Sequence, residues 1–284
     1  MHLLADIGGT NARFALADAA GTIRTRRVLP VQEFRSFEDA LAAFAIGLPE
    51  KPHGAAFSVA GPVIDNAVDM TNTNWRISVE AVCSVLPAIP VRIVNDLAAV
   101  ALAVPAMAPD DFEVLHAGDS ASAKGPILCI NLGTGFGAAL SLPVGDGWQP
   151  LATEAGHMTL ATCLEVERAT LGDAVTVEEV FSGPGLQRLR VQAEAVGACV
   201  AQFRRVYSNS LGRLVGDLTL STGAWGGVAL CGGVLQDFDT VIDRSTFLSG
   251  ICDRSGLATR LAKVPVRRIT REDPALFGLL QVIS

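Results

Sequence analysis

The opening residues of the chain form two apolar segments separated by a polar turn. The first segment begins at Leu3 and includes the carboxylate Asp6, and the turn Gly8-Gly9-Thr10-Asn11 separates it from a segment in which Phe14 and Leu16 share one face. This pattern predicts two antiparallel strands joined by a glycine-tipped hairpin. Glycines leave backbone N–H groups accessible, so the tip would form a concavity suited to phosphate oxygens. A hairpin turn without a ligand is the alternative.

After this hairpin, the spacing of apolar positions changes several times between a strand period and a helix period. Ser36 and Ser78 stand at the start of helical patterns, where a hydroxyl can accept hydrogen bonds from the first free N–H groups. The elements predicted up to residue 104 are strands at 23–31, 55–60 and 91–94 and helices at 36–46, 78–86 and 97–104. The resulting order, βββαβαβα, differs from a plain doubly wound sheet, which alternates strands and helices from its start.

The layout of the opening hairpin recurs later in the chain. The apolar run Ile127–Leu132 has Asn131 in the place of Asp6, and the turn Gly133-Thr134-Gly135 precedes a strand at 138–142. Because a strand follows instead of a helix, this turn does not match the dinucleotide-binding fingerprint, and the chain contains no GxxxxGK[ST] phosphate loop. The pattern therefore predicts an internal repeat on the scale of a domain.

Three further segments complete the predicted architecture. A short apolar strand at 228–231 ends in a third glycine turn, Gly232-Gly233, and residues 188–214 are largely helical in pattern. The last helix begins near Pro274, since proline is favoured in the first turn of a helix.

Composition narrows the classes of function. The chain has 284 residues, a net charge of −7 and no block of lysines and arginines, so neither a nucleic acid nor an anionic membrane is an expected partner. The opening residues lack the cationic start of a signal peptide, and the longest apolar run, 97–108, is too short to span a membrane. We therefore expect a soluble, cytoplasmic protein.

The six cysteines are widely scattered and form no CxxC pair. In a chain of this size that is not secreted, such cysteines are expected to be buried free thiols. A structural zinc site would need ligands at short spacing, and the sequence offers none.

The three glycine turns, with a carboxylate at the end of a strand, resemble the phosphate-1, phosphate-2 and adenosine motifs of the actin/hexokinase/Hsp70 ATPase superfamily. The motifs are DIGGTNAR (6–13), NLGTGFG (131–137) and CGGVL (231–235). Further segments stand in the order found in bacterial ATP-dependent glucokinases of the zinc-free branch, and this resemblance covers essentially the whole chain. These segments are TNTNW (71–75), IVNDLAAV (93–100), TEAGHM (153–158) and VEEVFSGPGL (177–186).

The resemblance implies an α/β fold of the actin-like, ribonuclease H-like ATPase type, with two domains built from repeated βββαβαβα units. The small domain would comprise residues 1–105 completed by 273–284, and the large domain would comprise 106–272. The active site would lie in the cleft between the two domains.

The resemblance also assigns the sugar-binding residues. Asp96 would be the catalytic base that accepts the proton of the attacking hydroxyl, although Asn95 and Asp96 at a helix start could equally serve only as caps. The remaining sugar ligands implied by the resemblance are Asn72, Asn95, Glu154, His157 and Glu178. Carboxylates, amides and an imidazole suit a sugar, whose hydroxyls both donate and accept. For His157 and Asn72 the alternatives are a structural histidine and an asparagine-rich turn.

ATP and Mg²⁺ are the implied cofactors. Asp6 would hold Mg²⁺ through water, because Mg²⁺ keeps much of its hydration shell and uses few carboxylates. The residues implied to bind the nucleotide are Asp6, Gly8, Gly9, Thr10, Asn11, Gly133, Thr134, Gly135, Gly232 and Gly233.

The sequence departs from the family pattern at several places. The second phosphate turn begins Asn131-Leu132, the histidine turn reads EAGH where EGGH is usual, and the chain is shorter between Leu186 and Trp225 and near its end. Ala155 is a mild change if its φ is negative. These departures bear on the dimer interface and the adenine contacts more than on the sugar site.

The function implied is that of a glucokinase, an enzyme that transfers the γ-phosphoryl group of ATP to the 6-hydroxyl of D-glucose at the entry to glycolysis. A kinase for another hexose or an amino sugar, and a non-catalytic sugar-sensing protein of the same fold, are the alternatives. The preferred hexose, the formation of a homodimer and the regulation of the protein stay open at this point.

Overall fold

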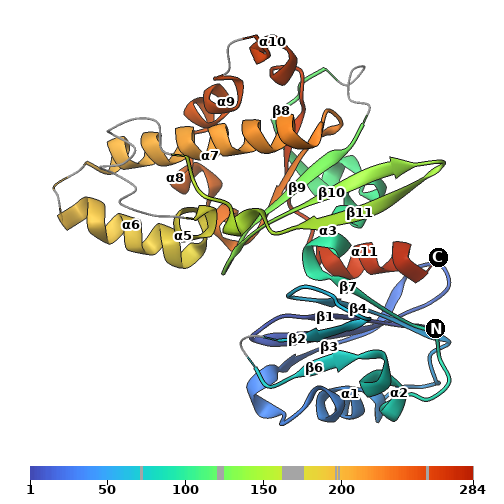
Figure 1. Ribbon diagram of the computed structural model, residues 1–284. Helices are drawn as coiled ribbons and strands as arrows, with labels where there is room; N and C mark the ends of the chain where they lie inside the picture. The colour runs from blue at the N-terminus through green and yellow to red at the C-terminus, as the bar shows by residue number, and fades with distance from the viewer. Residues whose placement is uncertain are drawn as a thin grey trace. The chain divides into compact units, whose positions relative to one another are not determined.

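The chain forms two compact units in the computed structural model. The first comprises Met1–Met107 with Glu272–Ser284, and the second comprises Ala108–Arg271. The structure describes residues 1–70, 73–119, 125–161, 176–195, 197, 199–253 and 256–283. Figure 1 shows the elements of both units.

The first unit contains seven strands and four longer helices among its described residues. Its strands are β1 (His2–Ile7), β2 (Asn11–Ala17), β3 (Ile23–Pro30), β4 (Gly54–Val59), β5 (Ala67–Asp69), β6 (Arg76–Ser78) and β7 (Val91–Asn95). Its helices are α1 (Phe37–Ala45), α2 (Val79–Val85), α3 (Asp96–Ala103) and α11 (Pro274–Ile283), with short 3₁₀ helices η1 (Val31–Glu33) and η2 (Val104–Ala106).

The second unit is larger. Its described strands are β8 (Phe112–His116), β9 (Ile127–Leu132), β10 (Phe136–Val144), β11 (Gly147–Thr153), β12 (Gly227–Cys231) and β13 (Val266–Ile269). Its described helices are α5 (Val177–Phe181), α6 (Gly183–Ala195), α7 (Val200–Thr222), α8 (Phe238–Val241), α9 (Arg244–Cys252) and α10 (Ala258–Leu261), with 3₁₀ helices η3 (Pro109–Asp111), η4 (Ala155–His157) and η5 (Gly233–Leu235).

The sheet of the first unit has the strand order β3-β2-β1-β4-β7. β1, β2 and β3 form an antiparallel meander, while β1, β4 and β7 run parallel. Parallel neighbours bring the carboxyl ends of β1, β4 and β7 to one edge. Asp6 lies beside Ser58 in this register, and Val59 lies beside Asn95. The edge therefore gathers the polar residues that follow each apolar run.

Helices cover both faces of this sheet. α1 and α2 lie on one face, and α3 and α11 lie on the other (Figure 1). On the α1 face, Phe14 stacks on Phe44 with ring centroids 5.1 Å apart, and Phe37 meets Phe57 edge-on at 5.6 Å. The Ser36 and Ser78 hydroxyls accept from the Asp39 and Ala81 N–H groups, so both predicted N-caps are confirmed.

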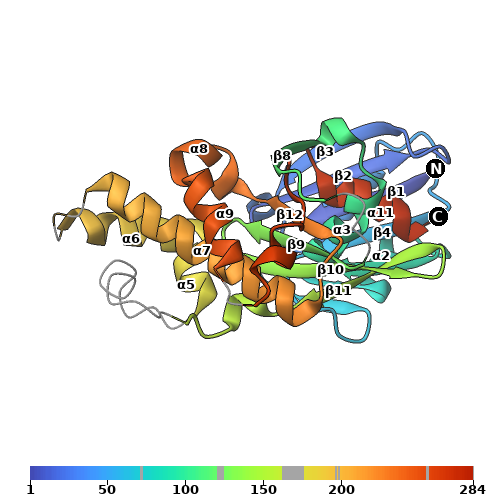
Figure 2. The ribbon, with the colours of Figure 1, turned by 90° about the horizontal axis from the view of Figure 1, so that it is seen from above.

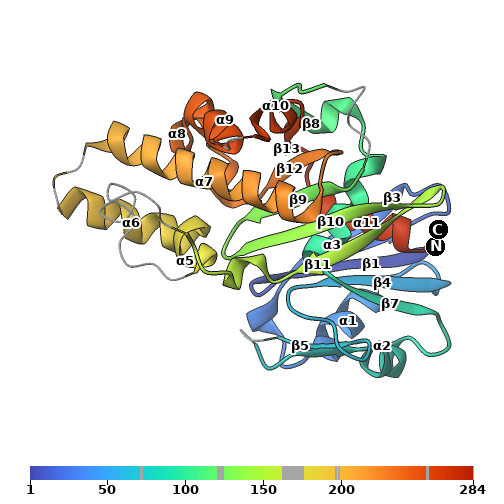
Figure 3. The same ribbon diagram turned by 45° about the horizontal axis from the view of Figure 1, so that its top comes forward.

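The second unit repeats this design. Its six-stranded sheet has the order β11-β10-β9-β12-β13-β8, in which β9, β10 and β11 form an antiparallel meander (Figure 3) and β12 and β13 run parallel to β9. The order of the first five strands matches that of the first unit, and β8 is an addition. The internal repeat predicted from the glycine turns is confirmed, together with the α/β fold class.

The long helix α7 packs closely on α9 (Figure 2). A Cβ placed on Gly212 would lie 2.1 Å from the Phe247 carbonyl oxygen, so only glycine allows this approach of the two helices. The helix ends at Gly223, whose φ of 66° is the left-handed conformation that favours glycine at a C-cap.

Some elements were not predicted from sequence. Strands β8, β11 and β13 and the short helices α8 to α10 follow no clear apolar period. β11 is an edge strand whose residues are mostly exposed, and β13 has two arginines between its buried ends. Edge exposure removes the alternation on which strand prediction depends.

The prediction of buried free thiols holds only in part. Cys129 and Cys231 are buried, Cys83 and Cys252 are half-buried, and Cys199 is exposed. The expectation is wrong for Cys199 because this residue is the N-cap of α7, where its sulfur accepts from the Gln202 N–H. Cys163 lies outside the described residues. Among the helices that the structure describes, none is long and apolar enough to cross a membrane.

Candidate functional site

The Asp6 carboxylate lies at the end of the first unit's sheet where the parallel strands β1, β4 and β7 have their carboxyl ends. Its Oδ1 accepts a hydrogen bond from the Ser58 hydroxyl at 2.7 Å, and its Oδ2 accepts from Arg13 at 3.2 Å. Ser58 is fully buried, whereas the Asp6 side chain keeps 19% of its surface exposed. Asp6 is therefore fixed from behind and open on one side.

The residues Asn95 and Asp96 lie where β7 passes into α3. The Asn95 Oδ1 accepts from the Leu97 and Ala98 N–H groups at 3.1 Å each, and its amide nitrogen donates to the Gly61 carbonyl at 3.1 Å. This is the capping role considered in the sequence analysis, and it leaves one Asn95 N–H for a ligand. The Asp96 Oδ1 accepts from the Leu97 N–H at 2.8 Å.

Burial raises the pKa of Asp96 to about 6, an effect that the Leu97 N–H partly offsets and the nearby Asp6 charge increases. Burial also raises the pKa of Asp6, while Ser58 and Arg13 act to lower it. A carboxylate with a pKa near neutrality is a stronger base than an exposed aspartate and still ionises in a cell. The two carboxyl groups therefore suit different tasks, Asp96 as a base and Asp6 as a fixed ligand.

The hairpin tip between β1 and β2 is a tight turn. The Gly8 N–H donates to the Asn11 carbonyl at 3.0 Å, and the Thr10 carbonyl accepts from the Val31 N–H at 2.9 Å. Gly9 and Thr10 are exposed, and neither Gly8 nor Gly9 has a positive φ. The two glycines therefore contribute by lacking a side chain and not by a left-handed backbone. The Gly8 N–H already donates a hydrogen bond within the turn.

In the second unit, the Glu178 carboxylate joins two of the sequence motifs. Its Oε2 accepts from the Phe136 N–H at 2.9 Å. A Cβ on Gly135 would lie 2.6 Å from this oxygen, and one on Gly156 would lie 3.5 Å from it. Glu178 thus lies against the second glycine turn and against the Glu154–His157 turn, so these three predicted regions lie together.

Glu154 is the N-cap of the short helix η4 and His157 is its last residue, and both are exposed. The His157 N–H donates to the Glu154 carbonyl at 3.0 Å. Gly156 is required here because a Cβ would lie 2.4 Å from the Phe136 carbonyl oxygen. Ala155 is buried and has no positive φ, so the condition under which its replacement of glycine is mild is met.

The second and third glycine turns meet at Asn131. The Gly133 carbonyl accepts from the Gly183 N–H at 2.7 Å, which fastens the SGPGL segment to the second turn. Gly232 has a φ of 110°, and a Cβ there would lie 2.5 Å from the Asn131 Oδ1. The third turn also borders a pocket of about 290 Å³, lined by Cys231, Gly232, Leu235, Gln236, Arg268, Ile269 and Thr270.

Each unit therefore gathers part of the predicted residues. The first brings Asp6, Asn95 and Asp96 to one sheet edge; the second brings Glu178 against Gly135 and Gly156. Asn72 lies outside the described residues. Sequence reasoning missed Ser58, whose only signal was one serine within an otherwise apolar strand.

A model of the Glucokinase family matches residues 3–200 and 190–284. The chain belongs to the glucokinase family.

Two relatives named glucokinase align with this chain over nearly their full lengths. The chain is 32% identical over 308 residues to a glucokinase of Aromatoleum aromaticum, an alignment that covers 98% of the chain and 92% of the relative. It is 33% identical over 311 residues to a glucokinase of Chromohalobacter salexigens, covering 99% of the chain and 97% of the relative.

Solved glucokinase structures have the same fold as this chain. The crystal structure of a glucokinase from an Antarctic psychrotroph superposes with a TM-score of 0.84 at 30% identity, covering 98% of this chain and 97% of that one. A ROK family glucokinase from Streptomyces griseus, solved with glucose and AMPPNP, shares the fold alone, with a TM-score of 0.64 at 20% identity over 99% and 98% of the two chains.

Proposed function

We propose that this protein is an ATP-dependent glucokinase that phosphorylates the 6-hydroxyl of D-glucose. The observation that carries the proposal is Asp96, a mostly buried carboxylate with a pKa of about 6 beside Asp6 at the glycine hairpin. Membership of the glucokinase family supports it, as does the 30% identity to a solved glucokinase over 98% of the chain. We further propose that residues of both units serve this one reaction.

In the proposed reaction, Asp96 accepts the proton of the sugar hydroxyl while that oxygen attacks the γ-phosphorus. A P–O bond forms to the sugar, and the bond between the γ-phosphorus and the bridging oxygen breaks, so ADP leaves with the electron pair. Phosphoryl transfer depends mainly on positioning and charge neutralisation, and one oriented carboxylate completes it. The protonated Asp96 then returns its proton to solvent.

Sugar hydroxyls would be held by groups that can accept and donate. Glu178 and Glu154 supply carboxylate acceptors, His157 supplies an imidazole, and Asn95 retains one N–H. We propose Asn72 as a further ligand on the strength of its motif. Such a set selects for hydroxyl number and direction, because a missing hydroxyl leaves a polar group without its partner.

Mg²⁺ fits the donors around Asp6. The part of the chain that the structure describes holds no cluster of three metal-ligating side chains, and Mg²⁺ bound with ATP needs only one or two carboxylates besides water and phosphate. Asp6 is open on one side and has further lone pairs on both oxygens. When bound, the ion would neutralise phosphate charge; Asp6 would hold it, and the glycine turns would contact the phosphates.

The direct test is glucose-dependent release of ADP from ATP, measured with a coupled assay over a panel of hexoses. We expect the highest kcat/KM with glucose. The absence of sugar-stimulated ADP release would overturn the proposed enzyme activity. A higher kcat/KM for mannose or an amino sugar would favour a kinase for that sugar. Glucose binding by calorimetry without turnover would favour a sugar-sensing protein.

A further proposal concerns the location of the enzyme. We propose that the protein is cytoplasmic, in keeping with its composition. The family resemblance leaves open whether it forms a homodimer, and light scattering would test this. No nucleic-acid partner is proposed, since the net charge is −7.

The pH dependence of turnover should follow Asp96. Because only the ionised carboxylate accepts a proton, kcat/KM should fall about tenfold per pH unit well below an apparent pKa of about 6. A folded pKa raised from 3.8 means that the native state binds this proton more tightly than the unfolded chain, so this group adds stability as the pH falls. Circular dichroism at each pH is the control for unfolding. A flat profile between pH 5 and 8 would contradict the assignment.

A further inference from the structure

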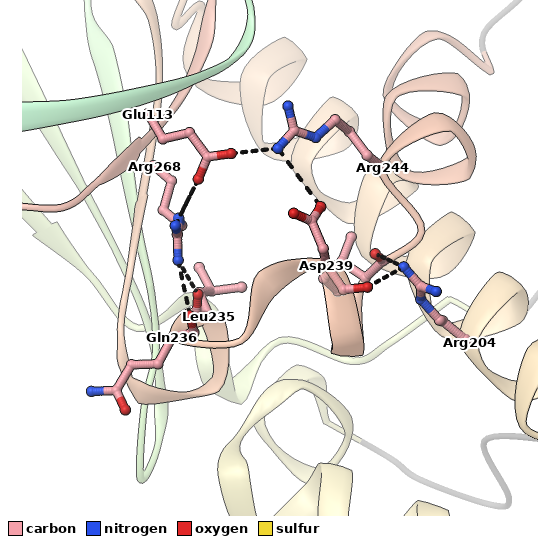
Figure 4. Close-up of polar contacts among 8 residues, drawn as sticks. Glu113, Arg204, Leu235, Gln236, Asp239, Arg244 and Arg268 are labelled. Carbon is pink, nitrogen blue, oxygen red and sulfur yellow. Dashed lines mark hydrogen bonds and ion pairs between the residues drawn. The ribbon is translucent and has the colours of Figure 1, made fainter.

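The third glycine turn of the chain, Gly232-Gly233 in the second unit, is held by hydrogen bonds from Arg268. One nitrogen of this guanidinium, Nη1, donates to the Leu235 carbonyl at 2.6 Å and to the Gln236 carbonyl at 3.2 Å. Figure 4 shows the two carbonyls at the end of the turn facing the guanidinium. These carbonyls end the helix η5 and would otherwise lack a partner within it.

Within the turn, the N–H groups of Leu235 and Gln236 are already used. They donate to the Gly232 and Gly233 carbonyls at 3.1 and 3.2 Å. Hydrogen bonds within the turn therefore satisfy its first two carbonyls, and Arg268 satisfies the carbonyls of Leu235 and Gln236 at its end. Arg268 also lines the pocket of about 290 Å³ that borders Gly232.

Arg268 is itself held in place by Glu113. The two residues stand directly opposite each other on the paired strands β13 and β8. The Glu113 Oε2 accepts from the Arg268 Nε at 2.8 Å and lies 2.7 Å from its Nη2. All three guanidinium nitrogens are thus engaged at once, in an arrangement that a planar fork allows and a lysine ammonium does not.

Two further arginines, Arg244 and Arg204, support the same segment. The other oxygen of Glu113 accepts from Arg244 of α9, and Arg244 lies 3.7 Å from the Asp239 carboxylate (Figure 4). The Arg244 guanidinium also lies over the Phe238 ring. Arg204 of α7 donates to the Asp239 and Ile242 carbonyls. Arginines from three elements therefore hold the segment that runs from the glycine turn through α8.

We propose that Arg268, oriented by Glu113, is a positioning residue for the nucleotide: it holds Gly232–Gln236 in the shape that receives the adenosine side of ATP. This inference rests on the proposed function, in which the third turn contacts the nucleotide. Because the sugar ligands are on other turns, Arg268 affects nucleotide affinity and leaves glucose affinity unchanged.

The test compares Arg268→Ala, Arg268→Lys and the matched control Arg271→Ala. Arg271 pairs with Asp111 of η3 at 3.1 and 3.2 Å, so its removal also breaks an arginine–carboxylate pair in this unit, and the carboxylate of that pair stands outside the turn. We expect Arg268→Ala to raise KM for MgATP about tenfold or more, the effect of losing hydrogen bonds from a charged donor, with KM for glucose within about twofold. Arg268→Lys should give a smaller rise, and Arg271→Ala should match the wild type.

A structural role alone would give a different result. Equal rises in KM for both substrates, or an unchanged KM for MgATP in a folded Arg268→Ala protein, would overturn the proposal. Should the alanine variant not fold, Arg268→Lys decides: an unchanged KM for MgATP overturns the proposal. Binding of MgADP by calorimetry gives the same comparison without turnover, so a wild-type protein that binds MgADP but lacks kinase activity would refute the proposed function and still test Arg268.

Discussion

Replacing Asp96 by asparagine should lower kcat about 10²–10⁴-fold, the usual contribution of a positioned general base. The change removes the proton acceptor but keeps a side-chain oxygen that can accept from the Leu97 N–H, so α3 should keep its start. Glucose affinity should stay within about threefold, since the amide retains the size of the carboxylate. The measurements are steady-state kinetics for kcat and calorimetry for glucose binding.

Asp39→Asn is the matched control for this variant. Asp39 is also an aspartate in the first turn of a helix in the same unit, where its N–H donates to the Ser36 cap, but its side chain is exposed. We expect unchanged turnover in this control. The decrease in activity below an apparent pKa of about 6 should also disappear in Asp96→Asn. Turnover close to that of the wild type in Asp96→Asn would exclude Asp96 as the base.

Gly278→Ala should be strongly destabilising, because α11 rests directly on the backbone of α3. A Cβ on Gly278 would lie 1.8 Å from the Ala99 carbonyl oxygen and 2.7 Å from its carbon. Backbone atoms cannot rotate away, so the two helices must separate. Overpacking of this kind costs about 1–3 kcal/mol or more, and it should lower the thermal midpoint by about 5–10 °C.

Gly47→Ala is the control for Gly278→Ala. A Cβ there would have its nearest neighbour, the Phe44 carbonyl oxygen, 4.0 Å away, and Gly47 has no positive φ. Its thermal midpoint should stay within about 2 °C of the wild type, since surface substitutions change stability by about 0.5 kcal/mol or less. Equal midpoints for both variants would refute the close packing of α11 on α3. Because α3 begins at Asp96, Gly278→Ala should also reduce kcat at temperatures where it is still folded.

The support of α3 by α11 explains why the end of the chain belongs to the first unit. α3 carries four alanines, and Gly278 faces it without a side chain, so the two helices approach closely. Asp273, just before α11, lies 3.7 Å from the Arg13 guanidinium, which in turn donates to Asp6. The residues after 272 therefore support both the helix that begins at Asp96 and the Asp6 carboxylate before the hairpin turn.

The sequence by itself determined the features that depend on neighbouring residues. Glycines at a strand end predicted the β1–β2 hairpin, serines predicted the caps of α1 and α2, and Pro274 predicted the start of α11. Turn and cap preferences come from local sterics and from free N–H groups, so a few residues suffice to show them. The family motifs added a list of residues predicted to bind the sugar and the nucleotide.

Only the tertiary structure decided what those candidates contact. The raised pKa of Asp96 requires burial beside Asp6, and the Asp6–Ser58 hydrogen bond joins residues 52 positions apart. Glu178 meets the Phe136 N–H across 42 positions, and Arg268 meets Glu113 across 155. These contacts arise from the pairing of distant strands and the packing of helices on them, so short-range spacing in the sequence carries no sign of them.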